Sequence, residues 1–542
     1  MENYTDMMEL MKKIKHGISK KHIKVALISN ISFEPYFYFL INKVFLESKI
    51  SVTVNTINYI ELLSSMGDEQ INDSDIVVVI PNFCDLYQDF FCCQSLNIEK
   101  TNELISTQVF NMKKICSLIH LKPNAFIVWF GYEDYCTNYN NTAIALSFAN
   151  MLVDKINEQL YNEKLDFIFL DLKRIVATIG INNAYDNKSK YRWNSPYSKL
   201  MIEQICNEIY KQYLIFNGIA KKCLVLDCDN VLWGGILSED GTEKIKLSNS
   251  GMGRIFQDFQ RFALSLYYHG ITLAVCSKNK FSDVLTMFHE HNGMILKEKH
   301  IACFQVNWED KPSNIKKIAE QLNISLDSIV FVDDSLIEIE AVKAILPNVT
   351  SILFKPYMDY QQFSCFNLRS SINTTDAENR NETYKTNSYR QELKAKCADY
   401  ADYIKELNIK IDIHPTLPIE YSRVSELTQR TNRCTNGRRY SILEIKERLA
   451  SDEVILYSVC VSDCFSDIGL VGAIEIEGDI LTLFSLSCRA LGRGIEREMM
   501  NFIETHHKVN NVICFSTGKN DKIKRLLSEK FLNISISSNK ID

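Results

Sequence analysis

Short apolar runs that end in polar residues recur along the first two-thirds of this 542-residue chain. Five of them form a first group: KVALISN (24–30), SVTVNT (51–56), DIVVVIP (75–81), AFIVWFG (125–131) and LDFIFLD (165–171). Helical patterns separate these runs, at spacings of roughly 25 to 50 residues. Buried runs that alternate with helices predict a doubly wound parallel sheet covered by helices. We therefore expect a first α/β domain over residues 1–215.

The strand ends of this first domain carry polar residues that allow two interpretations. They are Ser29-Asn30, Pro81-Asn82, Gly131-Tyr132-Glu133-Asp134 and Asp171. Ligands of such a sheet bind beyond the carboxyl ends of its strands, so these residues could be the remnant of a hydrolase site. Helix caps and turns use the same residue types. We favour caps and turns.

Two further segments follow the first domain. Four apolar runs define an α/β domain over residues 216–365: KCLVLDCD (222–229), ITLAVCSKN (271–279), ACFQVNW (302–308) and SIVFVDDS (328–335). The polar stretch 366–385 is predicted to be a linker. Residues 386–542 begin with a helical pattern and continue with three antiparallel-looking runs, EVILYSVCVSD, GLVGAIEIEGD and ILTLFSLSC. This third segment is predicted to be an α+β domain.

Composition limits the classes of protein that the chain can belong to. A hydrophobic content of 46% and a charged content of 24% are those of a globular protein. A net charge of −6 argues against a general nucleic-acid binder. We find no apolar run long enough for a membrane helix and no apolar signal core in the first twenty residues. The 17 cysteines form no CxxC pair, so we expect buried thiols in a reducing cytoplasm.

Residues suited to phosphate chemistry follow the strands of the second domain. They are Asp227 and Asp229, then Ser277 and Lys278, then Lys311, then Asp333 and Asp334. An Asp can attack phosphorus and carry a phosphoryl group, and a second Asp can move the proton of the leaving group. Further carboxylates can hold Mg²⁺, and a hydroxyl and a lysine can hold phosphate oxygens. Helix capping would explain one such Asp, but an ordered set of four strand ends favours a site.

The first of these strand ends, D-C-D-N-V at 227–231, resembles the first motif of the haloacid-dehalogenase (HAD) phosphohydrolases. The resemblance implies that Asp227 is the phosphoryl acceptor and Asp229 the general acid and base. It also implies phosphate binding by Ser277, Lys278 and Lys311. Magnesium would be held by Asp227, by the backbone carbonyl of Asp229, and by Asp333 and Asp334. The short stretch between LWGG and the next long helix leaves no room for a large cap domain.

The continuation LWGGILSEDG and the later FVDDSLIEIEAV resemble the FkbH-like subfamily of these enzymes. Such proteins often carry an SGNH-hydrolase-like α/β domain before the HAD domain and an acyltransferase-like domain after it. All three segments of this chain fit that order. The sequence departs from the subfamily in having DDSL in place of the usual DDNP, and the first segment shows no clear Ser–His set. Independent catalysis by the first domain is therefore not expected.

The stretch LSCRALGRGIEREMM in the third segment has the pattern R-x-x-G-x-G of the GNAT acyltransferases. Glycines allow a close backbone approach to an anion, and a helix N-terminus attracts pyrophosphate. An ordinary strand–helix turn explains two glycines nearly as well. The resemblance implies that Arg489, Gly492, Arg493 and Gly494 bind coenzyme A or carrier-borne phosphopantetheine. Three acids are candidate bases, Asp463, Asp467 and Glu475, although surface acids are the simpler interpretation.

Cys228, between the two aspartates, has two interpretations on physical grounds. Side chains alternate along a strand, so Asp227 and Asp229 share one face and Cys228 points to the other, into the core. A twist at the strand end could instead turn the thiol toward the site. The FkbH-like resemblance implies a catalytic thiol, because members that transfer glyceryl groups carry Cys inside this motif. Cys228 would then capture the acyl group of an acyl phosphate.

The expected function is therefore a Mg²⁺-dependent glyceryltransferase and phosphatase. It would dephosphorylate 1,3-bisphosphoglycerate or a related acyl phosphate and load the acyl group onto an acyl carrier protein for polyketide-type biosynthesis. One alternative is a plain HAD phosphatase acting on a small phosphorylated metabolite. Another is a GNAT-type acyltransferase with an idle HAD domain. Neither nucleic acid nor membrane is an expected partner.

Overall fold

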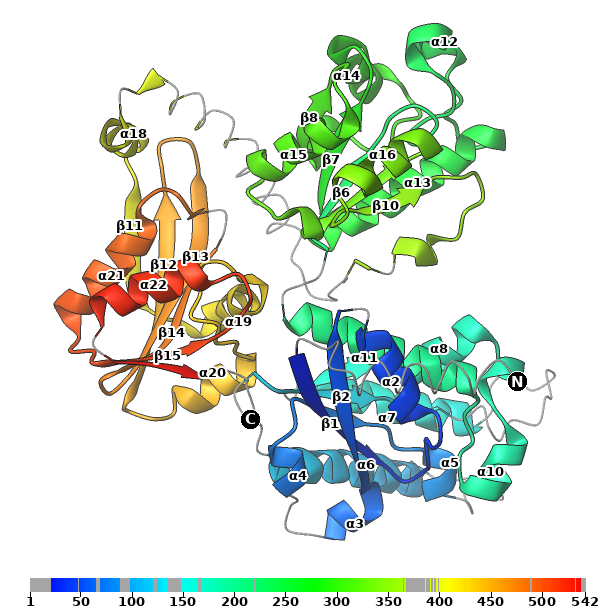
Figure 1. The fold of residues 1–542 in the computed structure, drawn as a ribbon. Coiled ribbons are helices and arrows are strands. Elements are labelled where there is room, and N and C mark those ends of the chain that lie inside the picture. The colour runs from blue at the N-terminus through cyan, green and yellow to red at the C-terminus, as the bar shows by residue number, and fades with distance from the viewer. Residues whose placement is uncertain are drawn as a thin grey trace. The chain divides into compact units, whose positions relative to one another are not determined.

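The computed structural model contains three β-sheets, one in each predicted segment (Figure 1). It describes residues 21–537 except 47, 65–68, 88–97, 120–123, 134–147, 164–166, 218–220, 364, most of 367–398, 488–489 and 532. The predicted linker 366–385 therefore lies almost entirely outside the described residues, and the domain boundaries remain predictions. Within the described ranges, no helix combines the length and apolar character that a membrane span requires.

The first sheet is parallel throughout and has the strand order β2-β1-β3-β4-β5. Its strands are β1 (Lys21–Ser29), β2 (Ile50–Asn58), β3 (Ile76–Val79), β4 (Phe126–Phe130) and β5 (Ile168–Leu170). All five coincide with predicted apolar runs, which confirms the α/β prediction for this segment. The sheet is built this way because β1, β3 and β4 are buried runs of branched and aromatic side chains.

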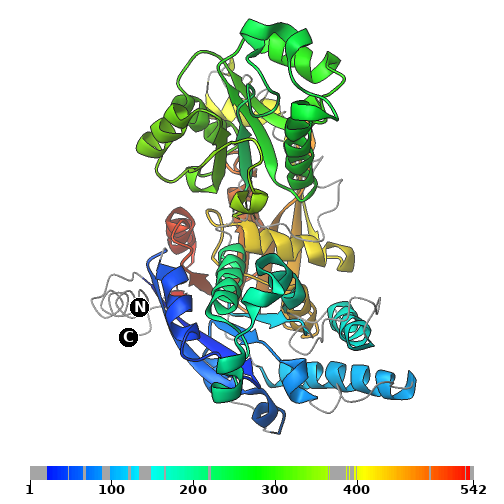
Figure 2. The same cartoon turned by 90° about the vertical axis from the view of Figure 1, so that its right-hand side faces the viewer.

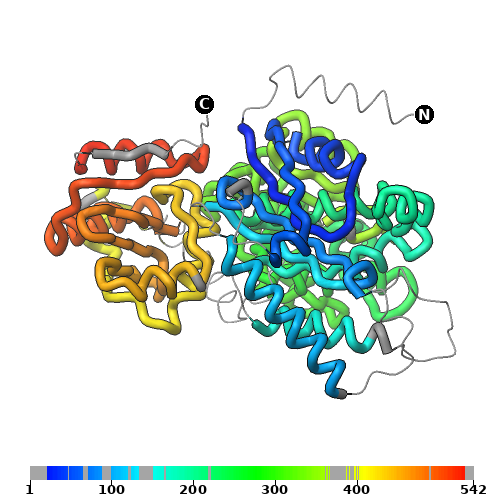
Figure 3. Tube along the Cα trace, turned by 90° about the horizontal axis from the view of Figure 1, so that it is seen from below, coloured from blue at the N-terminus to red at the C-terminus, as the bar shows by residue number. Residues whose placement is uncertain are grey.

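Helices connect the strands of the first sheet. The longer ones are α2 (Phe37–Leu46), α6 (Ile98–Leu118), α7 (Phe148–Asn162), α8 (Leu172–Ile179) and α11 (Lys199–Phe216). Shorter ones are α3 (Tyr59–Ser64), α4 (Glu69–Asn72), α5 (Phe83–Leu86), α9 (Ile181–Ala184) and α10 (Asn187–Trp193). Residues of α6 and α7 share one core with β1, β3 and β4, so both helices cover the same face of the sheet. The course of these helices can be followed in Figures 1 and 3.

The second sheet is also parallel, in the order β10-β9-β6-β7-β8. Its strands are β6 (Cys223–Leu226), β7 (Thr272–Ser277), β8 (Ile301–Val306), β9 (Ile329–Asp333) and β10 (Thr350–Leu353). Four of them were predicted, and β10 was missed because its side chains are only partly buried and its run is short. Strand β6 lies in the middle, so the residues that follow it reach the centre of the carboxyl edge.

Helices cover both faces of the second sheet (Figure 2). Residues of α13 (Gly251–Tyr268) and α14 (Phe281–Glu290) share a core with one side of the strands. Residues of α15 (Lys311–Gln321) and α16 (Leu336–Ile345) share a core with the other side. Only the short α12 (Leu237–Lys244) lies between β6 and α13, in a stretch that is described without gaps. The expectation of a domain without a large cap is therefore confirmed.

The third sheet is mixed, in the order β11-β12-β13-β14-β15-β16. Its strands are β11 (Lys410–Pro415), β12 (Val454–Ser462), β13 (Asp467–Glu477), β14 (Ile480–Leu486), β15 (Asn511–Phe515) and β16 (Asn533–Ser537). The first four are antiparallel and the last three parallel. Its helices are α18 (Tyr400–Leu407), η6 (Pro418–Glu420), α19 (Tyr421–Arg430), α20 (Ile442–Arg448), α21 (Ile495–His506) and α22 (Asp521–Lys530).

Strands β14 and β15 separate soon after they begin to pair. Their register contains only the pairs Ile480–Asn511 and Leu481–Val512. The segment 434–437 fills the space between them. Its Asn436 amide donates to the Phe484 carbonyl, its Asn436 carbonyl accepts from the Phe515 amide, and its side-chain amide donates to carbonyls on both sides. This segment therefore bridges the diverging strands as a short extra strand.

Candidate functional site

A buried lysine joins two carboxylates at the carboxyl edge of the second sheet. Lys311 Nζ lies 2.6 Å from Asp227 Oδ1 and 3.2 Å from Asp333 Oδ2, and it donates to the Cys276 carbonyl at 2.7 Å. Burial alone lowers the pKa of Lys311, but the charges of Asp227 and Asp333 raise it above the ordinary lysine value. The ammonium group is therefore charged and holds three strand ends together.

The sequence explains why Lys311 reaches this point. Lys311 is the first residue of α15, which Asp310 caps by accepting from the Ser313 amide. Pro312 follows at a position where a helix needs no N–H donor. The residue is 2% exposed, and its side chain extends from the helix start across the edge of the sheet to Asp227 and Asp333.

The carboxylates also form a set suited to a divalent cation. Oxygens of Asp227, Asp333 and Asp334 all lie within 4.8 Å of one another. Asp333 Oδ1 accepts from the Ser335 amide, whereas Asp333 Oδ2 is buried and has the Lys311 ammonium 3.2 Å away. Burial and the charge of Asp227 raise the pKa of both Asp333 and Asp334. Three crowded carboxylates at the edge of the sheet fit a Mg²⁺ ion, which takes oxygen ligands.

Asp229 is held in a fixed orientation by three donors. Trp233 Nε1 donates to Oδ1 at 2.8 Å, the Leu237 amide donates to the same oxygen at 3.1 Å, and Asn279 Nδ2 donates to Oδ2 at 2.9 Å. Burial raises the pKa of Asp229 above its usual value, although these donors oppose the rise. A carboxyl that is fixed in place and holds its proton more readily than usual is suited to general-acid work.

Two contributors to this arrangement were not assigned by sequence reasoning. Asn279 donates to Asp229 and also to the Ser277 hydroxyl at 3.1 Å, and it is 3% exposed. Trp233 is fully buried and supplies the indole donor. The only signal in the sequence was their place, two residues after Ser277 and inside the LWGG run. The hydrogen bonds themselves depend on β6 and β7 being neighbours.

The loop after β6 turns back over the strand end. Asn230 adopts a left-handed backbone conformation with φ of 53°, and its side chain accepts from the Gly235 amide at 3.0 Å. The backbone at Gly234 passes so close to Phe256 that a Cβ would lie 2.5 Å from the ring. Gly234 is therefore required for the loop to pack on α13, which in turn places Trp233 and Leu237 beside Asp229.

The thiol of Cys228 points into the protein. The residue is fully buried and belongs to the core formed with β6, β7 and α13. Burial, with a smaller contribution from the Asp227 charge, raises the pKa of the thiol well above its usual value, although the Ser277 hydroxyl opposes the rise. The side chain of Cys228 therefore faces the core, as one of its two interpretations expected. In this conformation the thiol is protonated and shielded from solvent.

Lys278 and the third-segment loop make contacts that were not expected. Lys278 Nζ donates to Glu338 on α16 at 2.6 Å, so its ammonium is directed to that helix.

The glycines of the third-segment loop have left-handed backbone conformations. Gly492 and Gly494 have φ of 76° and 78°, and Gly494 precedes α21 as its N-cap. The Arg493 side chain is 7% exposed and lies 3.7 Å from Asp463. Arg489 lies outside the described residues.

The acids considered as bases in the third segment are in part structural. Asp463 is bonded bidentately by Arg390 at 2.7 and 2.9 Å, and both side chains are buried. Glu475 is also buried and accepts from Arg448 Nε at 2.9 Å. Only Asp467 is exposed. The surface interpretation was therefore wrong for Asp463 and Glu475, which pair with the buried Arg390 and the partly buried Arg448.

Two of the polar residues at the strand ends of the first sheet act as helix caps. Asn82 caps α5 and Asp171 caps α8. Glu133 is 1% exposed and accepts hydrogen bonds from Asn82, Tyr185 and Tyr197. The interpretation as caps is confirmed for Asn82 and Asp171, whereas Glu133 forms a buried polar network. Asp134 lies outside the described residues.

Comparison with known proteins identifies a related fold. No family model matches the chain, and no curated protein matches it. A solved structure of the N-terminal part of the protein BF1531 from Bacteroides fragilis, containing a phosphatase domain and complexed with Mg, is similar at 25% identity and a TM-score of 0.58. The similarity covers 67% of this chain and 98% of that one. The magnesium complex of the HAD family enzyme bt-2542 from Bacteroides thetaiotaomicron matches at 14% identity and a TM-score of 0.21, over 27% of this chain and 98% of that one.

Proposed function

We propose that this chain is a Mg²⁺-dependent phosphohydrolase in which Asp227 accepts the phosphoryl group. It is an enzyme of the HAD phosphatase kind, and the similar Bacteroides fragilis structure contains a phosphatase domain with Mg. The observation that carries the proposal is the carboxylate set at the ends of β6 and β9. Asp227, Asp333 and Asp334 crowd their oxygens within 4.8 Å, and a single buried lysine offsets their charge. Such crowding of negative charges destabilises the folded protein unless a bound cation or substrate interacts with them.

The proposed reaction proceeds in two steps at Asp227. A carboxylate oxygen of Asp227 attacks phosphorus, and the bond from phosphorus to the leaving oxygen breaks as Asp229 donates its proton to that oxygen. A water molecule then attacks the phosphorus of the aspartyl phosphate and gives a proton to Asp229, while the bond from phosphorus to the Asp227 oxygen breaks. Inorganic phosphate leaves, and both carboxyl groups return to their starting protonation states.

The remaining residues position these groups. Lys311 offsets charge on Asp227 and can offset the charge of transferring phosphate oxygens. Asn279 and Trp233 fix Asp229, and Ser277 lies beside Asn279. Asp227, Asp333 and Asp334 would hold Mg²⁺, which supplies positive charge to the phosphate oxygens.

Phosphate release from acetyl phosphate and from p-nitrophenyl phosphate tests this proposal. We expect Mg²⁺-dependent release that EDTA abolishes and an excess of Mg²⁺ restores. Asp227→Asn is expected to lose roughly 10³-fold or more in rate. Asp283→Asn, an exposed aspartate on α14 with 48% side-chain exposure, is the matched control and should retain activity. Equal activity in Asp227→Asn and Asp283→Asn would exclude Asp227 as the phosphoryl acceptor.

A more specific proposal concerns the substrate. We propose that the phosphorylated compound is an acyl phosphate such as 1,3-bisphosphoglycerate, and that the acyl group passes to an acyl carrier protein. The FkbH-like resemblance and the absence of a cap over β6 support this, because an uncapped site can admit a protein-borne acceptor. We place the phosphopantetheine arm at the loop of Gly492 and Gly494, where Cβ atoms would find open space. Capture by Cys228 would require the loop after β6 to open.

The two proposals are separated by covalent labelling. Incubation with 1,3-bisphosphoglycerate should give an acyl adduct that hydroxylamine removes if Cys228 forms a thioester. The adduct should be absent in Cys228→Ala, while phosphate release from p-nitrophenyl phosphate persists. An adduct that is undiminished in Cys228→Ala would overturn the thioester step. If phosphate release needs Asp227 but no acyl adduct forms and no carrier protein is loaded, the chain is a plain phosphatase.

A further inference from the structure

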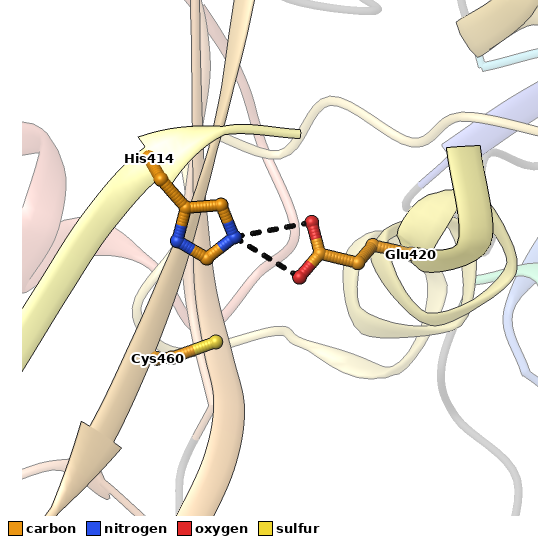
Figure 4. A group of neighbouring side chains, drawn as sticks. All are labelled: His414, Glu420 and Cys460. Atoms are coloured by element: carbon orange, nitrogen blue, oxygen red, sulfur yellow. Dashed lines mark hydrogen bonds and ion pairs between the residues drawn. The ribbon is translucent and has the colours of Figure 1, made fainter. Parts of the chain in front are cut away.

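Three side chains with different metal-binding atoms meet beside the edge strand of the third sheet. His414 on β11, Glu420 at the end of η6 and Cys460 on β12 each offer an atom within 4.8 Å of the others (Figure 4). Figure 4 shows the imidazole and the carboxylate facing each other, with the sulfur below them. All three side chains are partly exposed, so an ion from solvent can reach them.

The strand register explains why these groups share one face. Asp412 lies opposite Cys460 and His414 lies opposite Ser458 in the antiparallel pair β11–β12. Residues opposite each other in such a pair project to the same face, as do residues two apart along a strand. Asp412, His414, Ser458 and Cys460 therefore stand together on one side of the sheet.

A turn then brings Glu420 to this face. Strand β11 ends at Pro415, and η6 folds back toward the sheet. Glu420 Oε2 accepts from the Leu417 amide and from the Ser458 hydroxyl, both at 2.9 Å. Its Oε1 lies 3.1 Å from His414 Nε2. Oε2 also lies 3.3 Å from His414 Nε2, so both carboxylate oxygens face the histidine and one of them is fixed by protein donors (Figure 4).

We propose that His414, Glu420 and Cys460 bind a Zn²⁺ ion. Zinc accepts nitrogen, oxygen and thiolate ligands together, whereas Mg²⁺ and Ca²⁺ prefer oxygen. Asp412 Oδ2 lies 2.9 Å from His414 Nδ1, so it fixes the ring with Nε2 directed at the shared space. A carboxylate on the far nitrogen is the usual support of a zinc-bound histidine. Three protein ligands leave a fourth position of the tetrahedron for water or a substrate.

Zinc binding would require only small movements of the three ligand side chains. Ligand atoms around a tetrahedral zinc ion lie about 3.5 Å apart, given metal–ligand bonds of about 2.0–2.3 Å. The His414–Glu420 separation of 3.1 Å is already near this value. The ion would replace the hydrogen bond between these two side chains, and side-chain rotation would bring the Cys460 sulfur closer.

Two other interpretations fit the cluster less well. A His–Glu hydrogen bond by itself does not account for a thiol on the same face. A nucleophilic Cys–His pair needs the imidazole to face the thiol, but the two ring nitrogens of His414 face Asp412 and Glu420 instead. A divalent cation would use the nitrogen, oxygen and sulfur atoms together, and its binding would displace the thiol proton.

Cobalt titration of the reduced full-length chain tests the proposal, with excess Mg²⁺ present to occupy the carboxylate site of the second sheet. A thiolate ligand gives a sulfur-to-Co²⁺ charge-transfer band, and we expect this band at one equivalent and its loss when Zn²⁺ is added. Cys460→Ser should abolish the band. Cys464→Ser, at an exposed cysteine four residues away, is the matched control and should keep it.

Measurements of Zn²⁺ affinity distinguish the ligand His414 from Asp412, which supports it. His414→Gln should weaken Zn²⁺ binding by more than roughly 100-fold, and Asp412→Asn by roughly 10- to 100-fold, because Asp412 only supports a ligand. Zn²⁺ should also protect Cys460 from alkylation in the unmodified chain, a measurement that needs no variant. No charge-transfer band in the parent chain, a band unchanged by Cys460→Ser, or no protection of Cys460 would overturn the proposal. None of these outcomes depends on phosphatase activity.

Discussion

Lys311 Nζ lies 2.6 Å from Asp227 Oδ1, and the two side chains are 3% and 10% exposed. This buried pair joins the start of α15 to the end of β6, two elements that are 84 residues apart in the sequence. Because Lys311 also lies 3.2 Å from Asp333, its charge offsets two carboxylates at once. The stability of the second domain and its proposed chemistry therefore depend on the same group, the ammonium of Lys311.

Lys311→Met is expected to destabilise the chain strongly. Removal of one partner from a buried ion pair leaves an uncompensated charge and costs about 3–5 kcal/mol. Lys317→Met on the same helix should cost less than about 1 kcal/mol, since Lys317 and its partner Glu309 are both exposed. Urea unfolding of the two variants measures the difference. Similar midpoints for both would show that the buried pair contributes little.

Asp229→Asn should show a loss that depends on the leaving group. A general acid contributes roughly 10² to 10⁴ to rate when the leaving oxygen needs a proton. We therefore expect a large loss in the first step for alkyl phosphates and a small one for p-nitrophenyl phosphate, whose leaving group is stable as an anion. Burst kinetics would then report slow hydrolysis of the aspartyl phosphate. A loss that is the same for both substrates in the first step would contradict the role of Asp229.

Asn279→Ala should act through the position of Asp229. Asn279 donates to Asp229 Oδ2 at 2.9 Å, so its removal frees one side of that carboxyl. We expect kcat to fall by roughly tenfold while KM changes little, with the alkyl phosphates again affected most. Asn279→Asp cannot donate in its ionised form and should be no better than Asn279→Ala. A change in KM alone would assign Asn279 to substrate binding instead.

Cys228 should resist alkylation in the folded chain. Its thiol is fully buried and its pKa is raised, whereas Cys464 is exposed. Iodoacetamide at neutral pH should therefore label Cys464 well before Cys228, as peptide mass spectrometry can measure, and urea should remove the difference. Rapid labelling of Cys228 without denaturant would show that the loop after β6 opens readily. That result would strengthen the proposed acyl capture.

Gly437→Ala tests the segment that bridges β14 and β15. Gly437 has φ of 87°, and an added Cβ would lie 2.3 Å from the Phe515 carbonyl oxygen. Gly478→Ala is the matched control, because its φ of 59° is also left-handed but no atom lies within 4 Å. The control should lose about 1–2 kcal/mol from backbone strain alone, and Gly437→Ala clearly more. Equal losses of unfolding free energy, measured by thermal unfolding, would mean that the segment 434–437 can move to accommodate the added Cβ.

The sequence by itself determined the parallel sheets of the first two segments and the order of the polar strand ends. Asp227, Ser277 and Asp333 come directly after or at the ends of buried apolar runs, and the carboxyl ends of parallel strands share one edge. The side-chain period of two also favoured a buried Cys228. These conclusions needed only local periodicity and the geometry that every parallel sheet has.

Only the tertiary structure decided which side chains meet. It directed Lys278 to Glu338 and placed Asn279 between Asp229 and Ser277. It also joined His414, Glu420 and Cys460, which share no motif in the sequence. Such contacts depend on strand order, on register and on the direction of a turn. Spacing along the chain does not contain these quantities, because they follow from how whole elements pack.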